Sequence, residues 1–112
     1  MIKACYKHAG LDISETGYIE AYITGIPARD PIEAEALART FGASRDVHDP
    51  VLVGSVKANI GYTEAVSSLA AIIKTVFALQ ERVILPNLNY DTVNPKIPLE
   101  EWHLQVPRSL IQ

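Results

Sequence analysis

Two segments of this chain carry the hydrophobic pattern of parallel strands, and each is followed by a segment with the pattern of a helix. The first strand is predicted at Tyr18–Ile23, where β-branched and aromatic residues stand between Gly17 and Gly25. The second is predicted at Val51–Val56, a short valine-rich run that is typical of a strand buried on both faces. Strand, helix, strand and helix in this order predict an α/β fold with a parallel pair and a right-handed crossover.

The helix between the two strands has clear start and stop signals. Asp30 is predicted to cap its first turn, Pro31 suits the first helical position, and Glu33 completes the pattern of a capping box. Gly42 is predicted to end the helix. Apolar residues at helical spacing give it one packing face, made of Ala34, Leu37, Ala38 and Phe41.

The second helix is predicted at Thr63–Gln80. It is apolar on nearly all sides, so we expect it to be buried on most of them. It also carries Lys74 and two serines and is shorter than a bilayer span, so we expect no membrane association. Residues 2–9 are predicted to end a helix closed by Gly10.

The last third of the chain predicts little regular structure. Residues 83–95 are rich in turn-forming residues, with strands of three or four residues at most. Pro98–Pro107 is predicted to be an extended arm laid over a hydrophobic surface. We therefore expect one globular unit over residues 1–97 and an extended C-terminal arm over residues 98–112.

Composition narrows the classes of function. The 112 residues are 48% hydrophobic and 21% charged, which suits one soluble globular unit. A net charge of −3 with mixed signs offers no basic stripe, so nucleic acid is not an expected partner. The single cysteine, Cys5, excludes an internal disulfide and fits a reducing, cytoplasmic location. The three histidines have no metal-ligand spacing, so we expect no metal.

The candidate chemistry gathers after the second strand. Lys57 follows the carboxyl end of that strand, which is where ligands bind in open α/β sheets. Glu64 lies seven residues further on, in the first turn of the next helix, and is its plausible partner. From the pattern alone, Lys57 is either desolvated and paired or simply marks the exit of the strand to solvent.

Three motifs carry a resemblance to a known family. They are Tyr18–Ala21 followed by Thr24-Gly25, then Asp30–Leu37, then Gly54–Glu64 continuing into Leu69–Val76. In this order they closely resemble the C-terminal part of β-ketoacyl synthase (ketosynthase) domains. Ile97–Trp102 is most similar to the end of the ketosynthase domain in fungal highly reducing type I polyketide synthases. The resemblance implies the C-terminal half of a thiolase-like fold, βαβα with short extra strands and an extended C-terminal arm.

The resemblance also implies a chemistry. Ketosynthases of this family are homodimers that join acyl and malonyl thioesters by decarboxylative Claisen condensation. The malonyl unit is held on the phosphopantetheine arm of an acyl carrier protein. The catalytic set of the family is one cysteine, two histidines and a supporting lysine.

Carried over residue by residue, the two histidine positions are Tyr22 and Tyr62 in this chain. Lys57 and Glu64 stay in register with the family's active-site positions. Thr24 matches a threonine of the segment that holds the phosphopantetheine arm. Cys5 does not match the nucleophile, because its neighbours resemble a different helix of the family.

The two tyrosines change the expected chemistry. In the family, two neutral imidazole N–H donors stabilise the enolate oxygen that decarboxylation produces, and removing one such donor costs roughly 10²–10³ in rate. A phenol can donate a hydrogen bond, but its pKa of about 10 makes it a poor proton shuttle at neutral pH. We therefore expect the chain to be inactive alone and to bind no cofactor of its own.

Three hypotheses follow for the role of the chain. The first is a catalytically silent, truncated ketosynthase half that exposes a large apolar surface and self-associates. The second is a half-enzyme that docks with a complementary ketosynthase chain and works on acyl carrier protein thioesters. The third is an interaction module that occupies the dimer or docking surface of a full synthase. In the first hypothesis, Lys57 paired with Glu64 only holds the strand to the helix. In the second, it supports catalysis.

Overall fold

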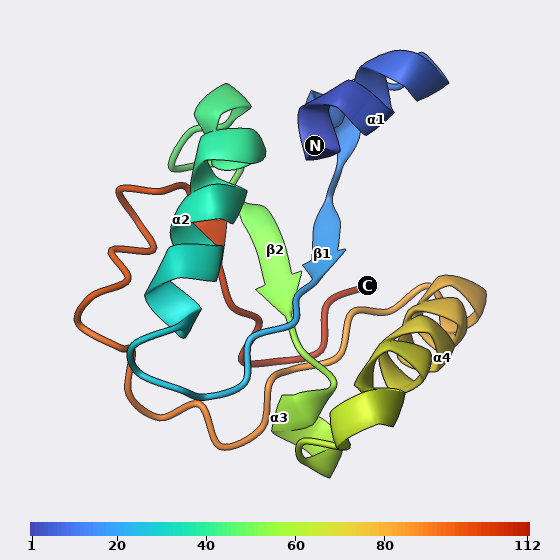
Figure 1. Ribbon diagram of the computed structural model, residues 1–112, viewed down its shortest axis with the longest axis vertical. Helices are drawn as coiled ribbons and strands as arrows, with labels where there is room; N and C mark the ends of the chain where they lie inside the picture. The colour runs from blue at the N-terminus through green and yellow to red at the C-terminus, as the bar shows by residue number, and fades with distance from the viewer.

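Three short parallel strands form the sheet in the computed structural model, which describes all residues from 1 to 112. Strand β1 (Tyr18–Glu20) pairs with β2 (Val51–Gly54), which pairs in turn with β3 (Leu104–Gln105). The predicted parallel pair is therefore confirmed, and Figure 1 shows β1 and β2 running in the same direction. The central strand is buried as predicted, with Val51 fully inaccessible and Val53 only 3% exposed.

The two long helices lie on opposite sides of these strands (Figure 1). Helix α2 (Asp30–Thr40) packs its apolar residues into a core shared with β2 and β3, as its spacing predicts. Helix α4 (Ser67–Glu81) meets the other face of β1. Side chains alternate along a strand, so Ile19 packs toward the core on the α2 side while Glu20 reaches α4.

The predicted capping box at the start of α2 is wrong. Neither Asp30 nor Glu33 makes a side-chain cap to its own helix. Asp30 accepts hydrogen bonds from the backbone N–H groups of Thr24 and Gly25, and Glu33 accepts those of Tyr22 and Ile23. The predicted strand at Tyr18–Ile23 ends early at Glu20. The N–H of Ala21 still bonds the carbonyl oxygen of Gly54 in β2, but the N–H groups of Tyr22 and Ile23 bond to the Glu33 carboxylate instead.

Helix α4 begins later than predicted and is more exposed than predicted. The chain first forms the short helix α3 (Lys57–Ile60) and a 3₁₀ turn at Glu64–Val66. Only Ser67 and Lys74 of α4 are buried, which contradicts the expectation of burial on most sides. A three-stranded sheet covers only one side of the helix, so its apolar residues face outward: Leu69, Ile72, Ile73, Val76, Phe77 and Leu79. None of the helices combines the length and apolar character needed to cross a bilayer.

The C-terminal segment lies on the core. Residues 82–103 form no strand, and Ile84 and Ile111 make only an isolated antiparallel bridge. The predicted arm does cover the hydrophobic core, with Trp102 packed against it and Leu104 buried within it. It also supplies β3, because Leu104 pairs with Val51.

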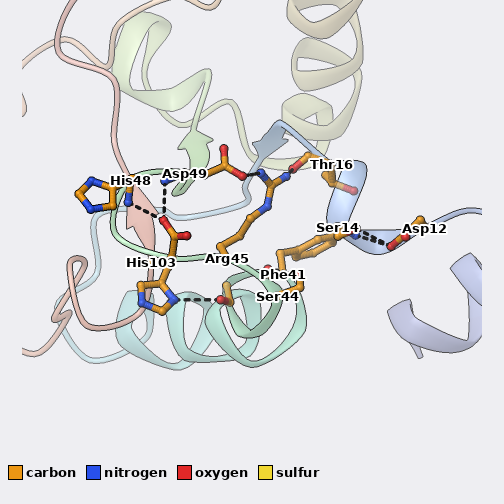
Figure 2. Close-up of polar contacts among 11 residues, drawn as sticks. Asp12, Ser14, Thr16, Phe41, Ser44, Arg45, His48, Asp49 and His103 are labelled. Atoms are coloured by element: carbon orange, nitrogen blue, oxygen red, sulfur yellow. Dashed lines mark hydrogen bonds and ion pairs between the residues drawn. The ribbon is translucent and has the colours of Figure 1, made fainter.

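Short elements complete the chain. Helix α1 (Ile2–Ala9) ends as predicted at Gly10, whose φ of 66° is in the left-handed region. Single 3₁₀ turns occur at Ile13–Glu15 and Gly42–Ser44. Figure 2 shows how the loop after α2 is anchored, with the guanidinium of Arg45 bonded to the carboxylate of Asp49 and to the carbonyl oxygen of Thr16. The ring of His103 bonds the carbonyl oxygen of Gly42, 3.1 Å away.

Candidate functional site

The two tyrosines that the resemblance places at histidine positions meet at the carboxyl end of the sheet. Tyr22 follows β1 and Tyr62 follows α3, and 40 residues separate them in the sequence. Their hydroxyl oxygens are 2.8 Å apart, and their rings pack edge to face with centroids 6.2 Å apart. Both side chains are about half exposed, at 51% and 53%. The predicted site residues are thus brought together, but as a mutually hydrogen-bonded pair.

Lys57 completes this cluster from α3. Its ammonium nitrogen lies over the ring of Tyr22, 4.4 Å from the centroid, which is a cation–π distance. The expected ion pair with Glu64 does not form. The three ion pairs of the chain are Lys74–Glu20, Arg39–Glu35 and Arg45–Asp49. Glu64 is exposed, whereas the half-buried Lys57 turns toward the aromatic ring.

Glu33 fixes the backbone from which Tyr22 projects. Its Oε1 accepts the N–H of Tyr22 at 2.7 Å and its Oε2 accepts the N–H of Ile23 at 3.0 Å. Asp30 does the same for Thr24 at 3.1 Å. The structure therefore places Thr24 beside Tyr22 on a loop held by two carboxylates, and its hydroxyl makes no hydrogen bond to the protein.

The hydrogen bond between the tyrosines raises the pKa of Tyr62. Removal of water by neighbouring groups adds to this effect, and the nearby Tyr22 and Glu64 contribute further. A phenol whose pKa lies above its usual value stays protonated at neutral pH, so Tyr62 can donate a hydrogen bond but cannot act as a base there.

Removing the Tyr22 hydroxyl should therefore bring the pKa of Tyr62 back down toward its usual value of about 10. We expect the Tyr22→Phe variant to show this in a pH titration followed by NMR of tyrosines labelled at the ring carbon that bears the hydroxyl. The Tyr62→Phe variant assigns the signal. An unchanged Tyr62 midpoint in Tyr22→Phe would show that the bond does not persist in solution.

A buried polar cluster that was not predicted from the sequence lies next to the site. The ammonium of Lys74 lies 2.8 Å from Glu20 Oε2 and 2.9 Å from the hydroxyl of Tyr18. The side chains of Lys74 and Glu20 are only 7% and 8% exposed. The other oxygen of Glu20 accepts the N–H of Val56, the residue just before Lys57. A lysine inside an otherwise apolar helix was the available signal for this cluster.

Burial of the phenol strongly raises the pKa of Tyr18, and the neighbouring Glu20 adds to this. Tyr18 therefore remains neutral and bonds to the carboxylate. A side chain on Gly54 would overlap the hydroxyl of Tyr18. The glycine at the end of β2 is thus required by the cluster.

A cavity of about 620 Å³ opens beside the cluster of Tyr22, Tyr62 and Lys57. Its lining includes residues that follow the carboxyl ends of all three strands, among them Thr24, Ser55 and Val106. The loop from 87 to 97 supplies another wall, and Lys57 belongs to the lining. Ligand sites of open α/β sheets lie at this edge.

This fold is that of a ketosynthase C-terminal domain, and the chain belongs to the β-ketoacyl synthase C-terminal domain family, whose sequence profile matches residues 1–91. It is 60% identical over 111 residues to the highly reducing polyketide synthase pks5 of Leptosphaeria maculans, and 47% identical over 110 residues to the highly reducing polyketide synthase AN6791 of Emericella nidulans. These matches cover 99% and 98% of this chain but only 4% of either relative.

Solved structures agree with this assignment. The chain superposes on a ketosynthase from module 1 of the bacillaene synthase of Bacillus amyloliquefaciens with a TM-score of 0.89 and 31% identity, covering all of this chain and 20% of that one. An oxazolomycin ketosynthase domain of Streptomyces albus gives a TM-score of 0.87 at 30% identity, covering 99% of this chain and 19% of that one. The expected C-terminal half of a ketosynthase fold and the likeness to fungal highly reducing polyketide synthases are both confirmed.

Proposed function

We propose that this chain is a ketosynthase C-terminal domain that does not catalyse condensation by itself. The hydrogen bond between Tyr22 and Tyr62 carries the proposal. When two hydroxyls bond to each other, one O–H is donated within the pair, so a single O–H is left for an incoming oxygen. An enolate oxygen would meet one phenol donor where the family offers two imidazole donors, and the reaction would lose roughly 10²–10³ in rate for the missing donor.

Proton transfer and acyl transfer also argue against catalysis by the chain alone. Tyr62 stays protonated at neutral pH because its pKa is raised, so it does not replace a histidine that exchanges protons. Cys5 is the single cysteine of the 112 residues, and it is exposed on α1. Figure 1 places α1 beyond the amino end of β1, whereas Lys57 and both tyrosines lie past the carboxyl ends. An acyl-cysteine at this site would need a thiol from another chain or segment.

The ligands that we propose for this domain are those of the parent reaction. It is the decarboxylative Claisen condensation of acyl and malonyl thioesters carried by the phosphopantetheine of an acyl carrier protein. Thr24 would contact the phosphopantetheine arm, and Lys57 and Glu64 would keep the positions they hold in the family. In this chain the ammonium of Lys57 lies over the ring of Tyr22.

Malonyl-carrier protein incubated with the purified chain tests this proposal. We expect release of carbon dioxide no faster than in the protein-free blank. A Tyr22→His, Tyr62→His variant mixed with a separately produced N-terminal ketosynthase half should decarboxylate the substrate, while the unmodified chain mixed with the same half should not. Decarboxylation or condensation by the unmodified chain alone would overturn the proposal.

A second candidate function is docking with a complementary ketosynthase chain, either as a half-enzyme or as an interaction module. The outward apolar residues of α4 favour it, because such a surface is typical of a protein interface. Binding can be measured with two immobilised baits, an isolated N-terminal half and an intact ketosynthase. Capture by the half alone supports the half-enzyme, capture by the intact synthase supports the interaction module, and capture by neither rejects docking.

A further inference from the structure

We propose that the cavity beneath the loop from 87 to 97 binds a free medium-chain carboxylate, with the carboxylate at Lys57 and the alkyl chain between the apolar walls. This inference is independent of whether the chain condenses thioesters. Its ligand is a free fatty acid, not a carrier-bound thioester. The site lies on the α2 side of the loop Tyr22–Gly25, and the tyrosine pair is not among its lining residues.

The size and walls of the cavity suit an alkyl chain. Its volume of about 620 Å³ lies within the range of about 300–1,000 Å³ that is usual for small-molecule sites. Half of the lining residues are hydrophobic. Leu37 comes from α2, Val53 from β2 and Leu104 from β3, so the apolar wall is made of rigid core elements.

The charge at the cavity selects an anion. Lys57 is the single cationic residue in the lining, and no carboxylate of the chain pairs with it. Its ammonium lies over the face of the Tyr22 ring and makes no hydrogen bond or ion pair within the chain, so its N–H groups are available to a ligand. The acidic residue in the lining, Asp30, already accepts backbone N–H groups with both oxygens.

Two further donors can hold the second carboxylate oxygen. Asn87 lines the cavity and uses its Oδ1 to accept the N–H of Ser55 at 3.2 Å, so its amide NH₂ makes no bond within the chain. The hydroxyl of Thr24 also lines the cavity without a protein partner. By contrast, both ends of the Asn94 amide are occupied, by the carbonyl oxygen of Pro27 and the N–H of Lys96. Asn87 and Thr24 therefore offer free donors to a ligand in this cavity, whereas Asn94 does not.

Decanoate titrated into the ¹⁵N-labelled full chain tests this assignment. We expect saturable shifts of the backbone signals of Thr24 and Ser55 and of the side-chain amide of Asn87. Decanol, which has the same tail without the charge, should bind roughly tenfold or more weakly. Lys57→Met should weaken decanoate to a similar extent, and Lys57→Arg should retain most of the affinity.

A second variant probes the tail. Ala58 lies in the cavity lining on α3, and Ala58→Leu should lower the affinity for decanoate by filling part of the volume. The exposed face of α4 is the competing apolar surface. Shifts confined to α4, or equal affinity for decanoate in the unmodified chain, Lys57→Met and Ala58→Leu, would overturn the proposal. Neither result bears on the decarboxylation assay.

Discussion

Replacing Lys74 with alanine is expected to lower the free energy of unfolding by roughly 3–5 kcal/mol, because it leaves a buried carboxylate without its partner. The ion pair with Glu20 is 2.8 Å long, and both side chains are more than nine-tenths buried. The hydroxyl of Tyr18 loses its ammonium contact at the same time. Urea unfolding of the dilute chain, followed by circular dichroism, measures the loss. A change of that size can remove the whole stability of a small domain, which would appear as the absence of a cooperative transition.

Two controls separate an unpaired charge from a general effect of removing lysine. Lys57→Ala removes an ammonium that lies over a ring face and makes no ion pair, so its cost should be about 1 kcal/mol or less. Replacing both members of the buried pair, Lys74→Met with Glu20→Leu, should recover part of the stability because no charge is left unpaired. If Lys74→Ala unfolds within 1 kcal/mol of the unmodified chain, water reaches this pair in solution.

The same ion pair connects the framework to the candidate site. Glu20 bonds the N–H of Val56, and α3 with Lys57 begins at the next residue. On the other side, Lys74 fixes α4 against β1. The carboxylate thus ties the position of Lys57 to that of α4, and a loss at Lys74 should disturb both.

The parallel strands and the helix at Asp30–Thr40 could be predicted because their signals are local. Short hydrophobic runs mark both strands, and Pro31 marks the helix start whatever lies beyond it. The roles of Asp30 and Glu33 could not be predicted in the same way. Local spacing favours caps for their own helix, but the nearby loop at Tyr22–Gly25 has four N–H groups without strand partners and takes both carboxylates.

The candidate site was predictable in part of its membership and not in its contacts, since Glu64 is exposed and forms no ion pair with Lys57. The alignment of motifs with ketosynthases places Tyr22, Tyr62 and Lys57 in one site, and the structure brings them together. The alignment does not indicate that the two phenols bond to each other, since the resemblance implies imidazoles at both positions. Lys74 was overlooked because a helical lysine usually lies in solvent, and only the tertiary structure shows the carboxylate on β1 that it meets.

The isolated chain is expected to self-associate through α4. This helix turns Ser67 and Lys74 toward the sheet and its large apolar side chains toward solvent, the reverse of a normal surface helix. Contiguous apolar surface of this kind is unfavourable in water, so copies of the chain should bury it against each other when no other partner is present. Analytical ultracentrifugation at micromolar concentrations should show concentration-dependent oligomers.

Charges placed on this face should reverse the association without unfolding the domain. Ile72 is 61% exposed and Phe77 is 59% exposed, so Ile72→Glu with Phe77→Glu removes little buried contact while making the face polar. The matched control is Ile32→Glu on α2, which is 69% exposed and lies away from α4. The double variant should sediment as a monomer, and the control should associate like the unmodified chain. A sharp two-state melt from a monodisperse monomer of the unmodified chain would contradict this prediction, because it would mean that the outward face of α4 is stable in water.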